Sequence, residues 1–106
     1  MSLLLRESEK SRADLEGIWE YIAFGNPVSG DPLSADRVVD AVARTYKLLT
    51  EQPHRTRIKD RDIYRTVVMD YPQYLIIYRF DDEAVEILRV FRGDLDWQRV
   101  VENDGL

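Results

Sequence analysis

The sequence contains no cysteine and only one histidine among its 106 residues. The missing thiols exclude disulfide frameworks, thiolate zinc sites, iron–sulfur clusters and cysteine nucleophiles. A Ser-His-Asp hydrolase would have to use His54, and the sequence has no Gly-x-Ser-x-Gly turn that could expose a nucleophile. Several large enzyme classes are therefore excluded, and the composition suits a reducing compartment, so we expect a cytoplasmic protein.

Other absences exclude cofactor and membrane functions. The five glycines are scattered, so no glycine-rich loop precedes a lysine to cradle a nucleotide phosphate. The apolar run Leu3–Leu5 is far too short for a signal peptide or a membrane span. Asp94 and Asp96 are too few carboxylates for a divalent ion. We therefore expect no cofactor, no metal site and no membrane association.

The charge is acidic overall but basic in the middle of the chain. Fifteen Lys and Arg residues stand against 20 Asp and Glu residues, a net charge of -5, which argues against direct nucleic-acid binding. From Arg55 to Arg79, six basic residues stand against three acidic ones, a local charge of +3. Two interpretations remain open: a solvated sheet edge that discourages strand pairing, or a patch for phosphate or an acidic partner.

The first half of the chain has the pattern of a short strand and two helices. Leu3–Leu5 predicts the strand, and Ser8 is a suitable cap for a helix that ends at Gly25-Asn26-Pro27. A second helix opens at Pro32 or Ser34 and ends before Pro53. Apolar residues recur at helical spacing in both segments: Leu15, Ile18, Trp19, Ile22, Val38, Val39, Val42, Tyr46 and Leu49.

The second half changes to β-strand patterns. Three strands separated by short polar breaks predict an antiparallel meander; they are Tyr64–Met69, Tyr74–Phe80 and Ala84–Phe91. Asp96 is suited to cap a last helical turn from Trp97 to Glu102. The whole chain, 1–106, therefore predicts one α+β domain in which an antiparallel helical hairpin packs against the meander.

Arginines in the meander are the residues most able to form a site. Arg89 interrupts the apolar strand Ala84–Phe91, so burial requires a paired acid, and Asp14 and Glu86 are the candidates. Arg92 precedes Gly93 at the end of this strand and is expected to be exposed, with Trp97 on the same contact surface. Arginine and tryptophan are common interface anchors. We thus expect a structural ion pair at Arg89 and no catalytic residues.

Five phrases in order resemble the ParE toxins, or plasmid stabilization system proteins, of the RelE/ParE superfamily. These phrases are SRADLEGIWEYIA (11–23), SADRVVDAV (34–42), Leu49-x-x-x-Pro53, YLIIYR (74–79) and VEILRVFRG (85–93). The resemblance covers nearly the whole chain and implies the α+β fold already expected. It also implies the toxin of a type II toxin–antitoxin system. The family's closing His-Gly-x-Arg-Asp phrase differs here, because the chain carries Arg92 and Leu95 in place of the His and Arg.

The superfamily has two branches with different targets. ParE toxins act on DNA gyrase and are neutralised by a ParD-like antitoxin in a hetero-oligomer, whereas RelE toxins cleave messenger RNA on the ribosome. The RelE branch uses a tyrosine or histidine near the carboxyl end, but this chain has no Tyr, His or Lys after Tyr78. The resemblance therefore favours a gyrase inhibitor over a nuclease. A RelE-type interferase and an inactive relic that only binds antitoxin remain the alternatives.

Five residues are expected to contact the antitoxin or the target. The candidates combine exposed cations of the basic segment with the end of the last strand: Arg57, Arg61, Arg65, Arg92 and Trp97. The sequence does not distinguish which of them meets the antitoxin and which meets gyrase.

Overall fold

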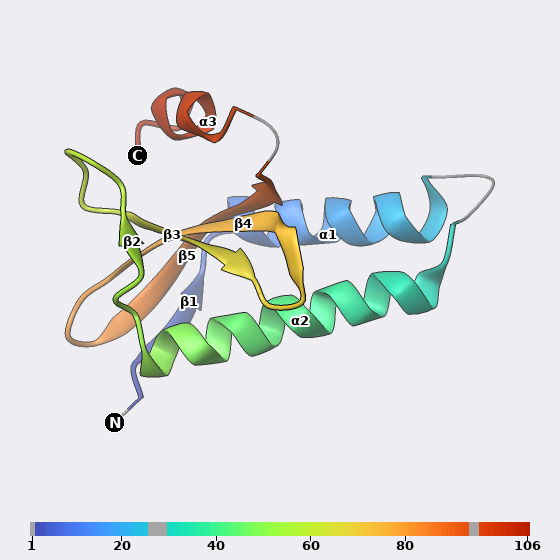
Figure 1. Ribbon diagram of the computed structural model, residues 1–106, viewed down its shortest axis with the longest axis horizontal. Helices are drawn as coiled ribbons and strands as arrows, with labels where there is room; N and C mark the ends of the chain where they lie inside the picture. The colour runs from blue at the N-terminus through green and yellow to red at the C-terminus, as the bar shows by residue number, and fades with distance from the viewer. Residues whose placement is uncertain (1, 26–29, 94–95) are drawn as a thin grey trace.

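The computed structural model describes residues 2–25, 30–93 and 96–106, so Asn26, Pro27, Asp94 and Leu95 lie outside the described residues. The described residues form three helices and a five-stranded sheet (Figure 1). The elements are β1 (Leu4–Glu7), α1 (Glu9–Phe24), α2 (Pro32–Glu51), β2 (Thr56–Arg57), β3 (Tyr64–Val68), β4 (Tyr71–Phe80), β5 (Ala84–Arg92) and α3 (Trp97–Asn103).

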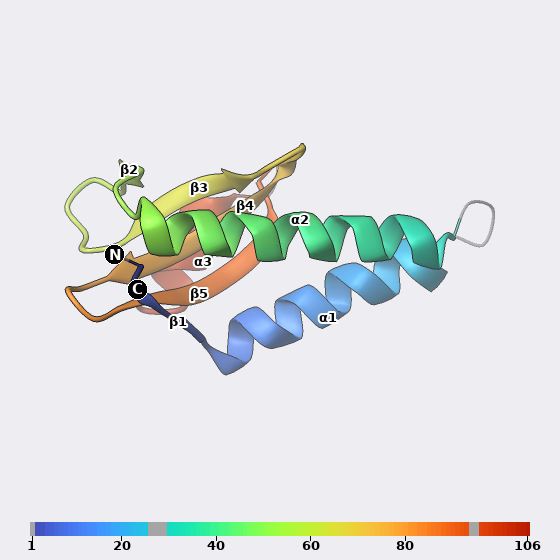
Figure 2. The same ribbon diagram turned by 90° about the horizontal axis from the view of Figure 1, so that it is seen from below.

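The sheet has the strand order β1-β5-β4-β3-β2. The first strand pairs in parallel with the last one, and the other pairs are antiparallel. Helices α1 and α2 lie side by side on one face of the sheet, and α3 lies on the other (Figures 1 and 2). The α+β class with a helical hairpin packed on a meander is therefore confirmed, and β2 is an added edge strand.

The β3–β4 connection is tighter than the sequence predicts. We expected a break at residues 70–73, but β4 already begins at Tyr71, and only Met69 and Asp70 form the turn. Asp70 has a φ of 67°, a left-handed conformation that aspartate tolerates better than most residues. Pro72 lies outside the register pairs of β4 with β3 and β5, so its missing N–H interrupts neither ladder.

Local capping positions both long helices. The Ser8 hydroxyl accepts from Ser11 N at 3.0 Å, as expected of the cap, and donates to Leu88 O at 2.9 Å, which ties the start of α1 to β5. Asp31 caps α2, with Pro32 in its first turn. None of the helices in the described part of the chain is both long and apolar enough to cross a membrane.

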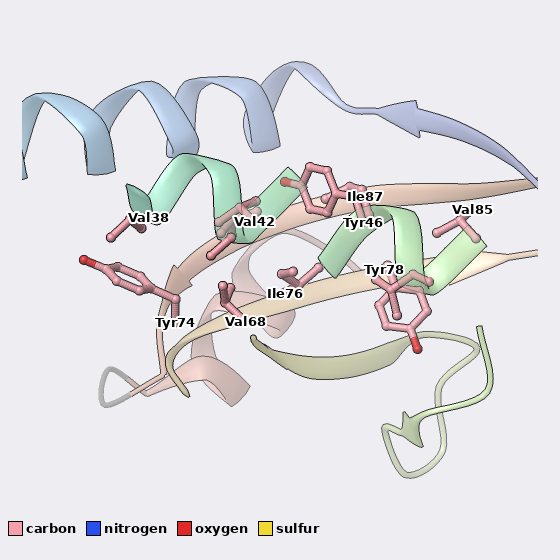
Figure 3. Close-up of a cluster of buried hydrophobic side chains, with 12 residues drawn as sticks. Val38, Val42, Tyr46, Val68, Tyr74, Ile76, Tyr78, Val85 and Ile87 are labelled. Carbon is pink, nitrogen blue, oxygen red and sulfur yellow. The ribbon is translucent and has the colours of Figure 1, made fainter. Parts of the chain in front are cut away.

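The two faces of the sheet bury separate apolar clusters. Strand β4 alternates between them. Tyr74, Ile76 and Tyr78 face α1 and α2 (Figure 3), whereas Leu75 and Ile77 belong to the cluster on the α3 side. All five side chains are buried, which explains why this strand is continuously apolar in sequence. The remaining members of the helix-side cluster include Val38, Val42, Tyr46, Leu49, Val68, Val85, Ile87 and Val90.

A bulge in β5 changes which way its side chains point. Tyr78 pairs with Ile87, but the preceding Ile77 pairs with Arg89, so Leu88 is an extra residue in β5. Opposed residues share a face of the sheet, and Ile77 faces α3, so Arg89 shares the α3 face too. Without the bulge, strict alternation from Ile87 would turn Arg89 into the helix-side core.

Two buried tyrosines make opposite predictions for stability. The Tyr46 hydroxyl is buried without a hydrogen-bond partner among the described residues, whereas the Tyr78 hydroxyl donates to Pro53 O at 2.6 Å. We expect Tyr46→Phe to leave the free energy of unfolding unchanged or to raise it by up to about 1 kcal/mol, and Tyr78→Phe to lower it by about 1 kcal/mol. Urea denaturation followed by circular dichroism measures both, and equal losses would contradict this assignment.

Candidate functional site

Arg89 is the centre of an ion-pair network that joins three elements. Its Nε and Nη2 atoms donate to the two carboxylate oxygens of Asp14 on α1, at 2.7 and 2.9 Å. Its Nη1 donates to Asp104, just beyond α3, at 2.5 Å. The three side chains are only 14 to 20% exposed. Arg89 therefore uses its guanidinium fork inside the protein, with its charge balanced by two carboxylates.

Asp14 also completes the edge of the sheet. Its Oδ2 accepts from Val90 N at 3.0 Å, in the part of β5 that lies beyond the last register pair with β1, Glu7 with Ile87. Beyond the end of β1, a side chain of helix α1 thus supplies the hydrogen-bond acceptor that a neighbouring strand would otherwise supply. Glu86, the other candidate partner from the sequence, instead pairs with Arg79 at 2.6 Å.

Asp104 is the part of this network that sequence reasoning missed. It receives a second cation, Lys10 Nζ, at 3.3 Å. The Arg89 hydrogen bond holds the pKa of Asp104 below its usual value, against the opposing effect of burial. Conversely, the hydrogen bonds that Arg89 donates to Asp14 raise the pKa of Arg89, which burial alone would lower. No spacing pattern links these residues, because the contact depends on how α3 packs.

Arg65 and Trp97 meet across the face of the sheet that α3 covers. The Arg65 Cζ lies 5.1 Å from the centroid of the Trp97 ring, within the range of a cation–π contact. Arg65 comes from β3 and Trp97 from the first turn of α3, so two candidate contact residues distant in sequence lie together. Both side chains are half-buried.

Arg57 and Arg61 extend this pair toward the sheet edge. Arg57 Nε donates to Arg61 O at 3.0 Å, and Arg61 Nη1 donates to the Leu106 carbonyl near the end of α3. We call these four residues, Arg57, Arg61, Arg65 and Trp97, the β2–α3 surface. Arg57 itself lies in the edge strand β2. The two interpretations of the basic segment, a solvated sheet edge and a patch for phosphate or an acidic partner, therefore apply to the same part of the molecule.

Arg92 does not belong to the β2–α3 surface. It pairs in register with Tyr74, whose side chain faces the long helices, and it lines a groove of about 580 Å³ with Gly17 and Tyr21 of α1. Trp97 packs in the cluster on the opposite face of the sheet. The sequence led us to expect one surface for Arg92 and Trp97, and the bulged strand instead separates them.

A cluster of phenol, phenyl and imidazole rings lies on the helix side of the sheet. The His54 ring is 4.8 Å from Phe80, which is 4.8 Å from Tyr64, and Tyr64 stacks on Tyr78 at 5.8 Å. Burial raises the pKa of the Tyr78 hydroxyl. Arg65 faces α3, so the sheet lies between its guanidinium and this cluster. In residues 2–25, 30–93 and 96–106, no three His, Asp or Glu side chains gather as a metal site.

Comparisons with known proteins agree with this architecture. The family model described as ParE toxin of the type II toxin–antitoxin system parDE matches residues 5–97. A chain from the chromosomal ParDE system of P. aeruginosa is 20% identical, with a TM-score of 0.69, covering 86% of this chain and 96% of that one. No curated protein sequence matches.

Two other solved structures have the same fold at low identity. A free-state variant of the E. coli toxin RelE, with two arginines replaced by alanine, has a TM-score of 0.65 at 13% identity, covering 97% of this chain and 98% of that one. A chain of the RelBE2 toxin–antitoxin complex from Mycobacterium tuberculosis has a TM-score of 0.53 at 21% identity, covering 87% and 99%.

The buried network predicts a large difference between two arginines. We expect Arg89→Ala to lower the free energy of unfolding by about 3 to 5 kcal/mol, because it removes the guanidinium that both enclosed carboxylates share and leaves Asp104 with Lys10 alone. Arg79→Ala is the matched control, since Arg79 also pairs with an acid but is 58% exposed, and it should cost less than about 1 kcal/mol. Denaturation by urea tests this, and similar losses in both variants would contradict a structural role for Arg89.

The lowered pKa of Asp104 predicts a loss of stability in acid. Its folded pKa is below its unfolded value, so the contribution is complete above the unfolded pKa and disappears as the pH falls through the folded pKa. We expect the stability of the wild type to fall more steeply than that of Asp104→Asn between about pH 5 and about pH 2. Parallel curves for the two proteins would show that the carboxylate contributes nothing.

Proposed function

Because this chain belongs to the ParE toxin family of type II toxin–antitoxin systems, we propose that it inhibits DNA gyrase by protein contact and is neutralised by a ParD-like antitoxin. The proposal includes a cytoplasmic location, where gyrase acts. It assigns the β2–α3 surface to contacts with these proteins and assigns no catalytic residue.

The internal pairing of Arg89 is the observation that carries the proposal. Cleavage of RNA through the 2′-hydroxyl needs an acid, a base and cations for the developing phosphorane charge. Arg89 is held by Asp14 and Asp104, so its guanidinium is committed to the fold and not to a phosphate. Arg65 is a second meander arginine, and its guanidinium could in principle clamp a phosphate. The sheet separates it from the imidazole and phenol groups, which supports binding over cleavage.

The chemistry of the β2–α3 surface suits a protein partner. Trp97 and the arginines beside it are residue types that dominate binding energy at interfaces. The local excess of positive charge favours an acidic partner surface, since complementary charge accelerates association and excludes wrong partners. An acidic antitoxin segment and an acidic gyrase surface both satisfy this condition, and competition between them would explain neutralisation.

A supercoiling assay with purified gyrase tests the target. We expect the wild-type chain to inhibit supercoiling and the co-expressed ParD-type antitoxin to relieve the inhibition. Arg57→Glu and Arg65→Glu should raise the concentration for half-inhibition at least about ten-fold, equivalent to about 1.4 kcal/mol. Arg12→Glu is the matched control, because it reverses an exposed charge on α1 away from the β2–α3 surface.

Two outcomes would overturn the proposal. Site-specific cuts in messenger RNA on translating ribosomes, lost in an Arg65→Ala variant, would establish the RelE-type activity instead. Unimpaired growth and unimpaired supercoiling at saturating toxin, with antitoxin binding retained, would establish a relic that only binds its antitoxin.

A further inference from the structure

The edge strand β2 covers only the first part of β3. Its two residues pair with Tyr64 and Arg65, and the register between the two strands stops there. Among the described residues, no strand lies beyond residues 66–68 on that side of the sheet. Open edges are usually blocked, because their unpaired N–H and C=O groups accept further strands.

The backbone N–H and C=O groups of Val67 point toward the open edge of β3 beyond β2. Ile63 accepts from Ile58 N at 2.9 Å across the same edge, and Arg65 pairs with Thr56. Backbone groups alternate sides along a strand, so Val67 is the next residue directed outward. The opening closes two residues later, where Met69 N donates to Thr45 Oγ1 of α2 at 3.0 Å. The accessible edge is therefore short and centred on one residue.

An apolar cavity adjoins the open edge. It has a volume of about 200 Å³ and is lined by Leu48 and Leu49 of α2 together with Thr66 and Met69. The side chains of Val67 and Met69 also line this cavity and are 49% and 40% exposed, so apolar surface extends from the cavity onto the open edge. The cavity suits one apolar side chain of an added strand, in the way that strand-addition sites read alternate residues.

The charges around this edge indicate what kind of added strand it would bind. Arg55 lines the cavity, and along the chain Arg57, Lys59 and Arg61 outnumber the acidic residues Asp60 and Asp62, so the charge beside the cavity is positive. At the other end, Arg44 is 3.4 Å from Asp70, so that end is electrically balanced. The cations at one end favour carboxylates in the occupant, and the cavity favours an apolar residue between them.

We propose that the free edge of β3 receives an extended acidic and apolar segment of the antitoxin as an added strand. The segment hydrogen-bonds to the backbone of Val67, places one apolar side chain between α2 and β3, and sets a carboxylate against Arg55. This inference rests on the proposed toxin function and adds to it the mode of antitoxin binding.

A pair of substitutions at one position tests the backbone contact. Val67→Pro removes the outward N–H, while Val67→Thr keeps the N–H and a β-branched shape, and both leave the β4 side of β3 intact. With a cognate ParD-type antitoxin as the probe, we expect Val67→Pro to raise the Kd at least ten-fold in calorimetry. Val67→Thr should stay within about two-fold of the wild type. Thermal unfolding of both variants controls for folding.

Two further measurements make the outcome decisive. Arg55→Glu should raise the Kd at least ten-fold, and Arg12→Glu should not. The Val67 amide should exchange with solvent more slowly in the complex than in the free chain. Equal Kd values for Val67→Pro and the wild type, with unchanged exchange at Val67, would overturn the strand addition while leaving antitoxin binding intact. A wild-type chain that binds no antitoxin would instead overturn the proposed function and this inference with it.

Discussion

The guanidinium of Arg89 is the point at which the first helix, the last strand and the last helix meet. Its hydrogen bonds to Asp14 fix α1 along the edge of the sheet, and its bond to Asp104 fixes the chain just after α3. Asp14 in turn supplies an acceptor to the backbone of β5. Ions enclosed to this degree stabilise a structure only while every partner is present. The position of α3, and with it Trp97, depends on this network.

The bulge at Leu88 determines which groups the guanidinium of Arg89 can reach. By turning Arg89 to the α3 side, it brings the cation within reach of both carboxylates and keeps it out of the apolar cluster beneath the helices. The same change of phase sends Arg92 back to the helix side. The extra residue Leu88 thus places Arg89 in the buried ion-pair network. It also places Arg92 on the opposite face of the sheet from Trp97.

The pattern of the sequence predicts most of the fold but less of the site. Helical spacing and the runs of β4 and β5 are local signals, so both helices and the meander follow from them. Asp14 was one of two acids considered for Arg89, since a buried arginine requires one. Asp104 and the separation of Arg92 from Trp97 could not be predicted, because they depend on the bulge and on how α3 packs. A bulge has no reliable signature in a single apolar strand.

The parallel pairing of β1 with β5 has a consequence for how the chain is made. Residues 4–7 pair with residues 84–87, and Asp14 binds Arg89, which follows it by 75 residues in the chain. Contacts this distant in sequence slow folding and cannot form on a nascent chain until nearly all of it has left the ribosome. An incomplete chain therefore lacks the ion pairs that position α3, and its contact surface is not yet formed. A partner that recognises the finished surface therefore meets it only when synthesis is nearly complete.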